Sequence, residues 1–194
     1  MIRTESLCVA YGGQRVLRDC TLKLEAGERV ALMGPSGCGK TTLLQVLAGL
    51  LPPDSGRFAV KGRVSYVFQE PALFPWLTAA QNINVVLSDR PETLSRALSL
   101  LDALELADCR DKYPAQLSGG QKQRVSIARA LAFGGDVLLL DEPLKGLDPA
   151  VREKAAALIL QEWAGKTLLL VTHDPAEAAL LCTRTLRFSG GSFV

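Results

Sequence analysis

The sequence has 194 residues, of which 48% are apolar. Its 22 basic and 20 acidic residues leave a net charge of +2, and a charge this close to zero predicts neither a nucleic-acid nor a membrane-surface partner. Its five cysteines are scattered and form no CxxC pair, which argues against a zinc site and favours a reduced, cytosolic chain. MIRTESLCVAYGG lacks the apolar core of a signal peptide and no apolar run approaches the roughly 18 residues of a membrane span, so we expect a soluble domain whose membrane contacts would need another chain.

The first third of the chain shows strand and helix patterns in turn. Residues 19–27 alternate apolar and polar side chains, and the apolar run 29–34 ends in glycine, as a buried strand would. A helical period follows over 40–50, then a turn at 52–56 and a further strand at 62–68.

From about residue 72 to residue 133 the patterns are mostly helical. In the stretch 91–106, one helix face is expected to carry Leu94, Ala97, Leu98, Leu101 and Leu104. Ser118 is a good N-cap for a helix that continues through Val125 and Leu131.

Strands and helices alternate again after residue 133. The expected elements are a strand at 136–142, a helix at 148–165, a strand at 166–172, a short helix at 174–182 and a strand at 185–190. Asp148 is expected to cap the long helix, with Pro149 in its first turn. This alternation implies a parallel α/β sheet, and we expect one domain, residues 1–194, with an inserted helical subdomain at about 72–133.

GPSGCGKT, Gly34 to Thr41, fits the phosphate-loop pattern G-x-x-x-x-G-K-[ST] between a predicted strand and a predicted helix. Its glycines would let backbone amides curl around phosphates, Lys40 would face the β and γ phosphates, and the Thr41 hydroxyl would ligate Mg²⁺. Cys38 lies two residues from Lys40 at a helix N-terminus, a setting that raises thiol reactivity; the alternative is a small residue that fills the loop.

VLLLDE, Val137 to Glu142, is an apolar strand that ends in two carboxylates. Asp141 fits the aspartate that binds Mg²⁺ in phosphate-loop enzymes, and Glu142 would act on the attacking water as general base. Two solvated acids at a strand end are the alternative.

QLSGGQKQR, residues 116–124, places two adjacent glycines at a predicted helix start, where they cost backbone entropy. They make sense where an anion approaches the amides of a helix N-terminus. A flexible helix cap would explain Ser118 but not both glycines.

In this order, GPSGCGKT, LSGGQKQR, VLLLDE and the lone His173 in LLLVTHD resemble the ATP-binding cassette (ABC) transporter ATPases, over nearly the whole chain. LSGGQ is the most specific motif, because other phosphate-loop NTPases lack it. The resemblance implies an α/β fold with a phosphate-loop NTPase parallel sheet core, an N-terminal antiparallel β portion and an inserted α-helical subdomain.

The resemblance also implies roles for individual residues. Catalysis would fall to Glu142, His173 and Gln69, and Mg²⁺ to Thr41, Gln69 and Asp141. The implied ATP-binding residues are Tyr11, Val16, Gly34, Pro35, Ser36, Gly37, Cys38, Gly39, Lys40, Thr41 and Thr42. The implied contacts to the nucleotide of a second chain are Ser118, Gly119, Gly120, Gln121 and Asp148.

Some of these positions have plainer alternatives. Tyr11 would stack on adenine or be an ordinary strand-end tyrosine, and Gln69 would be a plain polar loop residue. A lone histidine such as His173 is more often structural than catalytic. Lys145 departs from the family pattern before Leu-Asp, and it would pair across a dimer interface or simply be solvated.

A proline-flanked loop, residues 70–83, carries Leu73, Phe74, Trp76 and Leu77. Aromatics of this kind usually mark a partner surface, although one or two of them would also suit a core. The segment FPWLT resembles the corresponding segment in the ATPases of bacterial importers of nitrate, sulfonate and taurine.

The resemblance implies an ATPase that powers solute import through a separate permease by ATP-driven closure of a homodimer, at the cytoplasmic face of the inner membrane. Mg²⁺ is the implied cofactor, with transmembrane permease subunits and a solute-binding protein as partners and no nucleic acid. A soluble ABC ATPase outside transport and the cassette of an exporter are the alternatives. The interval from Gln69 to Ser118 is too short for the coiled coil of many soluble relatives.

Overall fold

The computed structural model describes residues 1–87 and 93–194. The chain divides into two compact units, one formed by residues 1–66, 135–142 and 165–194, the other by residues 67–134 and 143–164. The assignment of both units to one domain stays a prediction.

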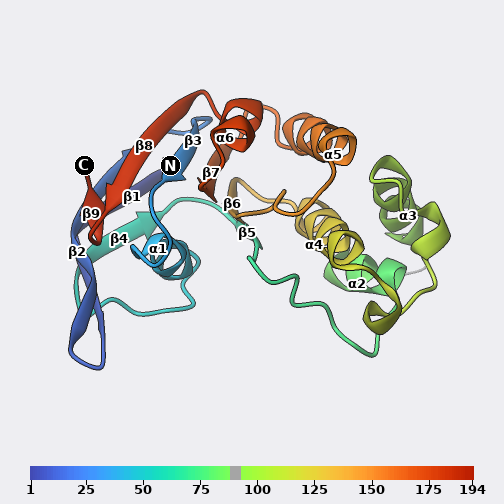
Figure 1. Cartoon of the computed structure of the whole chain (residues 1–194), viewed down its shortest axis with the longest axis horizontal. Helices are drawn as coiled ribbons and strands as arrows, with labels where there is room; N and C mark the ends of the chain where they lie inside the picture. Colours follow the sequence, from blue (N-terminus) through green and yellow to red (C-terminus); the bar gives the residue numbers. More distant parts are fainter. Residues whose placement is uncertain (88–92) are drawn as a thin grey trace. The chain divides into compact units, whose positions relative to one another are not determined.

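The first unit carries the strands (Figure 1). An antiparallel sheet has the order β2-β1-β4 and a second sheet the order β5-β6-β7-β3-β8-β9. In chain order the unit's elements are β1 (Ile2–Tyr11), β2 (Gln14–Leu24), β3 (Arg29–Met33), α1 (Lys40–Leu47), β4 (Ser55–Val60), β5 (Val64–Val67), β6 (Val137–Asp141), β7 (Thr167–Thr172), α6 (Pro175–Leu181), β8 (Arg184–Ser189) and β9 (Ser192–Phe193).

Parallel pairing joins β6 to β7, β7 to β3 and β3 to β8. Side chains along β6 and β7 are buried throughout, which is the pattern of a parallel strand covered on both faces. The expected α/β fold, with a parallel sheet and an N-terminal antiparallel portion, is therefore confirmed.

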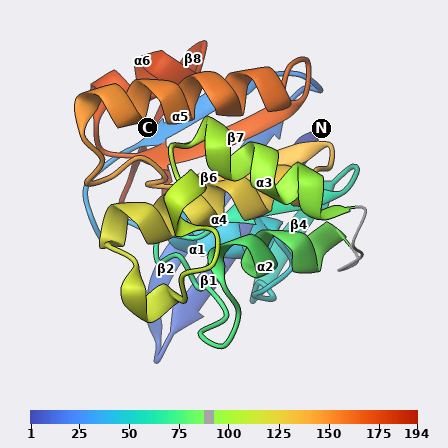
Figure 2. The ribbon, with the colours of Figure 1, turned by 90° about the vertical axis from the view of Figure 1, so that its right-hand side faces the viewer.

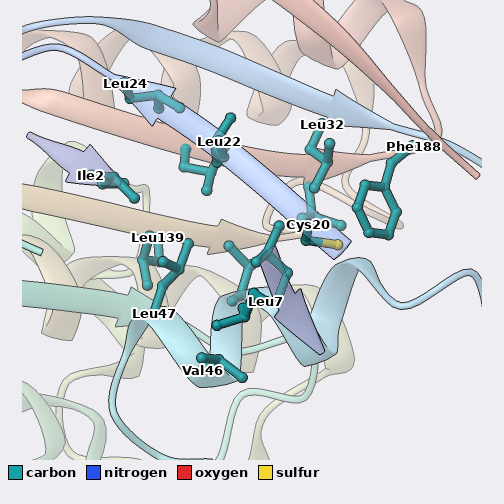
Figure 3. Close-up of a cluster of buried hydrophobic side chains, with 14 of the residues drawn as sticks. Ile2, Leu7, Cys20, Leu22, Leu24, Leu32, Val46, Leu47, Leu139 and Phe188 are labelled. Carbon is teal, nitrogen blue, oxygen red and sulfur yellow. The ribbon is translucent and has the colours of Figure 1, made fainter. Parts of the chain in front are cut away.

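Helix α1 packs its apolar residues into a core shared by the two sheets (Figure 3). Leu7 of β1, Val46 and Leu47 of α1 and Leu139 of β6 meet there. This burial fixes the start of α1 against the end of β3, which sets the position of the loop between them.

The second unit is mostly helical (Figure 2). Helices α2, α3 and α4 pack against one another, and α5 contacts α4. Its elements are α2 (Ala79–Asn84), α3 (Leu94–Ala103), α4 (Gly119–Phe133), α5 (Pro149–Glu162) and the 3₁₀ turns Val85–Leu87, Ala107–Cys109 and Pro114–Gln116.

Several expectations about local structure were wrong. Helix structure starts at Ala79 rather than at residue 72, because a loop precedes the Thr78 capping box. On α3, Leu94 is exposed while Leu100, outside the expected face, is buried; the expected helix start at 91–92 lies outside the described residues. The expected turn at 52–56 overlaps the first residues of β4.

Candidate functional site

The carboxyl ends of β3, β6 and β7 lie at one edge of the parallel sheet. The loop 34–39 follows β3, Asp141 ends β6, and Thr172 ends β7 with His173 directly after it. Ligands of open parallel sheets bind outside such strand ends, so the candidate site of the first unit lies at this edge.

The phosphate-loop segment depends on its glycines where the backbone is crowded. A Cβ at Gly34 would lie 1.9 Å from the carbonyl oxygen of Phe188. Gly39, the N-cap of α1, has a φ of 105°, and a Cβ there would lie 2.8 Å from the carbonyl oxygen of Val16. The loop therefore has this shape only with glycine at both positions.

Lys40 is held over this loop. Its Nζ donates to the carbonyl oxygens of Gly34 and Pro35, each at 2.8 Å, and lies 3.7 Å from Cys38 Sγ. The Lys40 side chain is buried, so its positive charge is fixed next to the loop that leads into the N-terminus of α1. This arrangement is suited to binding phosphate.

Asp141 is only 1% exposed, and among residues 1–87 and 93–194 neither of its carboxylate oxygens makes a hydrogen bond of ordinary geometry, although the Thr41 and Tyr66 hydroxyls lie close to it. Burial raises the pKa of Asp141, Glu142 raises it further, and the Thr41 hydroxyl and the Lys40 ammonium oppose the rise. A buried carboxylate with incomplete hydrogen bonding is costly, and a cation would relieve that cost.

The donors around Asp141 fit Mg²⁺. This ion is commonly held by one or two carboxylates together with substrate phosphates and waters, and Asp141 and the Thr41 hydroxyl supply such oxygens. No cluster of three or more histidine, cysteine, aspartate or glutamate side chains suited to a metal occurs among the described residues, so a site held by protein ligands alone is not found in them.

Glu142 and His173 form a pair. His173 Nδ1 lies 2.9 Å from Glu142 Oε1, with the glutamate nearly buried and the imidazole exposed. Glu142 has a φ of 47° and its N–H donates to the carbonyl of Val171 at 2.9 Å. A positive φ in a residue other than glycine stores about 1–3 kcal/mol and aims the carboxylate away from the strand direction.

Two residues predicted to contact the nucleotide lie near the hairpin of β1 and β2. Tyr11 ends β1 opposite Gln14 and is exposed. Val16 lies on β2 with its carbonyl beside Gly39, so it borders the phosphate-loop segment. The remaining predicted loop residues, Ser36, Gly37 and Thr42, lie between β3 and the first turn of α1.

The predicted residues Gln69, Ser118 to Gln121 and Asp148 belong to the second unit. Ser118 caps α4 as expected: its hydroxyl accepts from the Gln121 N–H at 3.2 Å, and the Gln121 side chain accepts from the Ser118 N–H at 2.9 Å. With Ser118 as the N-cap, Gly119 and Gly120 are the first two residues of α4. Asp148 is the N-cap residue of α5 as expected, but its side chain makes no capping hydrogen bond.

The loop 71–78 exposes Phe74 and Trp76, which are 40% and 69% accessible. Their rings lie 5.7 Å apart, and the Arg129 guanidinium lies 5.8 Å from the Phe74 ring. Arg129 donates to the carbonyls of Pro71 and Ala72, while Asn82 accepts from the Phe74 N–H and donates to its carbonyl. Hydrogen bonds from Arg129 and Asn82 thus fix the backbone of this loop, while the rings of Phe74 and Trp76 remain exposed.

Sequence patterns gave no sign of the supporting roles of Asn82 and Arg129. Asn82 lies in a short helix with no periodic signal, and Arg129 reads as an ordinary polar position of α4. Their burial was the missing information: Asn82 is fully buried, and burial lowers the pKa of Arg129.

Comparison with known proteins gives a consistent result. A family model described as "ABC transporter" matches residues 17–145. The chain is 43% identical to the taurine import ATP-binding protein TauB of Pseudomonas aeruginosa, covering 95% of this chain and 76% of that protein. It is 43% identical to the sulfate/thiosulfate import ATP-binding protein CysA 2 of Chromobacterium violaceum, covering 98% of this chain but only 56% of that protein.

Solved structures match as well. A dimeric structure of the ATP-binding cassette MJ0796 in a post-hydrolysis state, bound to ADP and Pi, has a TM-score of 0.92 and 32% sequence identity. That match covers 100% of this chain and 96% of the other.

Proposed function

Because this chain belongs to the ABC transporter family, we propose that it is the ATP-binding and ATP-hydrolysing subunit of a solute importer. One observation carries the proposal: a single sheet edge collects the glycine-dependent loop with its fixed Lys40, the buried Asp141 carboxylate and the Glu142–His173 pair. These are the groups that phosphoryl transfer requires, a phosphate cradle, a cation ligand and a group to act on water.

ATP binding falls to the first unit. The amides of residues 34–42 and the Lys40 ammonium surround the β and γ phosphates. Lys40 already rests on the carbonyls of Gly34 and Pro35, so phosphate replaces those contacts with stronger charge-assisted ones. Tyr11 stacks on adenine, and Val16 packs beside the nucleotide.

Mg²⁺ would be held by Thr41, Asp141 and Gln69 together with phosphate oxygens. When bound, the ion neutralises charge that develops on the transferring phosphoryl group. The Asp141 carboxylate is buried and neither of its oxygens makes a hydrogen bond of ordinary geometry among the described residues, which supports this assignment.

Hydrolysis is assigned to Glu142. A water oxygen attacks the γ-phosphorus, the bond from that phosphorus to the β–γ bridging oxygen breaks, and the water proton passes to the Glu142 carboxylate. A general base of this kind contributes about 10²–10⁴-fold. His173, 2.9 Å from Glu142, orients the water and the γ-phosphate, and Gln69 assists.

Two copies of the chain complete each site. Ser118, Gly119, Gly120 and Gln121 of one chain contact the γ-phosphate held by the other, and Asp148 communicates across the interface. The first turn of α4 begins with two glycines and is capped by the Ser118–Gln121 box, which supports this role, because a helix N-terminus with glycines attracts anions. The dimeric state of the similar cassette MJ0796 adds support.

The proposed partners are transmembrane permease subunits and a solute-binding protein, with the dimer attached at the cytoplasmic face of the inner membrane. Among the described residues there is no helix with the length and apolarity to cross a membrane. The similar proteins are named for import of taurine, aliphatic sulfonates and sulfate or thiosulfate, and we propose as the solute a small sulfur compound with a sulfonate or sulfate-like group.

Reconstitution tests this function. The chain is co-purified with the permease encoded beside it and placed in proteoliposomes with the solute-binding protein. Taurine, an alkanesulfonate and sulfate are then compared for ATP-driven uptake and for stimulation of ATP hydrolysis. Uptake of one of them that requires ATP supports the proposal. Hydrolysis that no permease stimulates, with no uptake, contradicts the importer function.

A further inference from the structure

Beneath the candidate site lies a buried carboxylate with no part in the proposed chemistry. Glu177, in the first turn of α6, is 3% exposed, and its Oε2 accepts the hydroxyl proton of Thr172. Thr172 is fully buried at the end of β7. Helix α6 packs on β7 and β3, which places this carboxylate under the sheet edge.

The Thr172 hydroxyl has a second partner. The N–H of Asp174 donates to Thr172 Oγ1 at 3.0 Å, and Asp174 Oδ1 accepts from the Ala176 N–H at 2.9 Å. A hydroxyl has one proton to give and two lone pairs to accept with. Because Glu177 takes that proton, the lone pairs of Thr172 are directed to the Asp174 amide.

These contacts bracket His173. The residue before it supplies the hydroxyl, and the residue after it supplies the amide, so the backbone turn that carries the imidazole is closed by one side chain. The imidazole itself is 56% exposed, and packing therefore does little to hold it. Its direction depends on this turn and on the contact with Glu142.

Because the hydrogen bond between Thr172 and Glu177 is buried, it is costly to lose. An O–H···O⁻ hydrogen bond is about twice as strong as a neutral one, and the loss of a partner in a buried site leaves a polar atom unsatisfied at about 1–3 kcal/mol. Burial raises the pKa of the neighbouring Cys182 thiol to about 12, opposed by Arg29 and reinforced by Glu177.

We propose that Glu177 is a positioning residue: through the Thr172 hydroxyl it fixes the turn that aims His173 at Glu142 and at the γ-phosphate. The role in hydrolysis rests on the proposed ATPase function. The effect on the His173 ring does not, since it concerns the nucleotide-free chain alone.

The chain's single histidine makes the test direct. In a chain labelled with ¹⁵N-histidine and purified with a tag free of histidine, imidazole nitrogen spectra report His173 alone. Glu177→Ala and Thr172→Val are expected to shift these resonances and alter the tautomer balance. Glu177→Gln and Thr172→Ser retain an acceptor and a hydroxyl, and are expected to keep wild-type spectra.

Activity is the second measurement. A displaced orienting group costs up to about 10²-fold in rate, so we expect Glu177→Ala and Thr172→Val to lower kcat about 10-fold or more. The Kd for ATP should stay within about twofold, because the phosphate loop is untouched. Glu153→Ala removes an exposed carboxylate of α5 and is the matched control, with unchanged spectra and kcat.

Melting curves separate misfolding from misplacement. If Glu177→Ala does not fold, the Thr172→Val and Thr172→Ser pair carries the comparison. Folded Glu177→Ala or Thr172→Val with wild-type imidazole spectra overturns the proposal. If the wild-type chain proves not to hydrolyse ATP, the proposed function fails, while the spectra still decide whether Glu177 positions His173.

Discussion

His173 Nδ1 lies 2.9 Å from Glu142 Oε1 although 31 residues separate the two in the chain. They come from the ends of adjacent parallel strands, β6 and β7, and the strained φ of Glu142 turns its carboxylate toward the histidine. In the proposed mechanism the pair puts the acceptor of the water proton next to the group that contacts the γ-phosphate. Removal of the charge of Glu142 should therefore stop hydrolysis without preventing ATP binding.

Glu142→Gln tests this separation. We expect kcat to fall by at least about 10²-fold, the lower end of what a general base contributes, with little change in the Kd for ATP. The variant should accumulate as an ATP-bound dimer, measured by light scattering after gel filtration in ATP. Glu153→Gln is the control for loss of an exposed carboxylate. An ATP-loaded variant that remains monomeric would count against the shared site.

Asp141→Asn should stabilise the nucleotide-free chain while abolishing hydrolysis. The pKa of Asp141 is raised in the folded chain, so the folded chain holds this proton more tightly than the unfolded chain. Its contribution to stability is present at low pH and lost as pH rises through the folded pKa. At neutral pH the ionised carboxylate lowers the free energy of unfolding, and the neutral amide removes that penalty.

Thermal melts at pH 5 and pH 8 without nucleotide measure the effect. A gain of about 1 kcal/mol corresponds to about 2–4 °C in a chain of this size, and the gain should be larger at pH 8. Added Mg-ATP should raise the Tm of the wild type more than that of the variant. A variant that melts lower than the wild type at both values of pH contradicts the account.

The parallel core of this fold was predictable, because its strands are continuous apolar runs with helices between them. Residues 29–34, 136–142 and 166–172 fell on β3, β6 and β7 with boundary errors of a residue or two. Strand β1 was not predicted: positive φ at Ser6, with register shifts in its pairing to β2, breaks the alternation of side chains that would have revealed it.

The site was predictable as residue types in sequence order, but its geometry was not. The segment VLLLDE does not predict the positive φ of Glu142. That conformation depends on the hydrogen bond from the Glu142 N–H to the carbonyl of Val171 in another strand. The Thr172–Glu177 contact was not predicted either, because it also depends on packing between separate elements. A glutamate in the polar-looking stretch DPAEA reads as solvated until the helix is packed on the sheet.

Gly119→Ala isolates the proposed contact between chains. A Cβ at this position has no other atom within 4 Å among the described residues, and alanine is the better helix former by up to about 1 kcal/mol. The variant should therefore melt no lower than the wild type and bind ATP normally as a monomer. Hydrolysis should fall about 10-fold or more, because the methyl group stands where a second chain's phosphate meets the amide.

Steady-state ATPase rates, Tm and ATP affinity of Gly119→Ala decide the matter together. Gly120→Ala is less clean, since its Cβ would lie 3.3 Å from Leu147 Cδ2 and disturb the second unit itself. Wild-type ATPase activity in a Gly119→Ala dimer would show that no phosphate approaches this helix end.

Cys38 should make the ATPase sensitive to thiol alkylation. Its Sγ lies 3.7 Å from Lys40 Nζ inside the phosphate loop, so an added group would occupy the space of the phosphates. Burial raises the pKa of Cys20 to about 11 and that of Cys182 to about 12, which slows their reaction. We expect N-ethylmaleimide to abolish activity, bound ATP to protect, and Cys38→Ser to resist. Equal sensitivity of Cys38→Ser contradicts the assignment.

Trp76→Ala should uncouple the chain from its permease without harming its own catalysis. Trp76 is the more exposed member of the Phe74–Trp76 pair, in a loop whose backbone is bound by Arg129 and Asn82, and aromatic side chains are enriched among the residues that dominate protein interfaces. Truncation of an interface tryptophan commonly costs 2 kcal/mol or more. We therefore expect permease affinity to fall at least about 10-fold, measured by co-purification and titration, with unchanged basal ATPase activity.

The matched control is Leu50→Ala, which removes an exposed apolar side chain, 59% accessible, from the first unit. If general surface hydrophobicity drives association, both variants weaken binding alike; if the Phe74–Trp76 pair is the docking surface, only Trp76→Ala does. Asn82→Ala adds a further comparison, because it leaves both rings intact and removes the hydrogen bonds that fix the Phe74 backbone. A permease that binds Trp76→Ala and Asn82→Ala as tightly as the wild type must dock elsewhere on the chain.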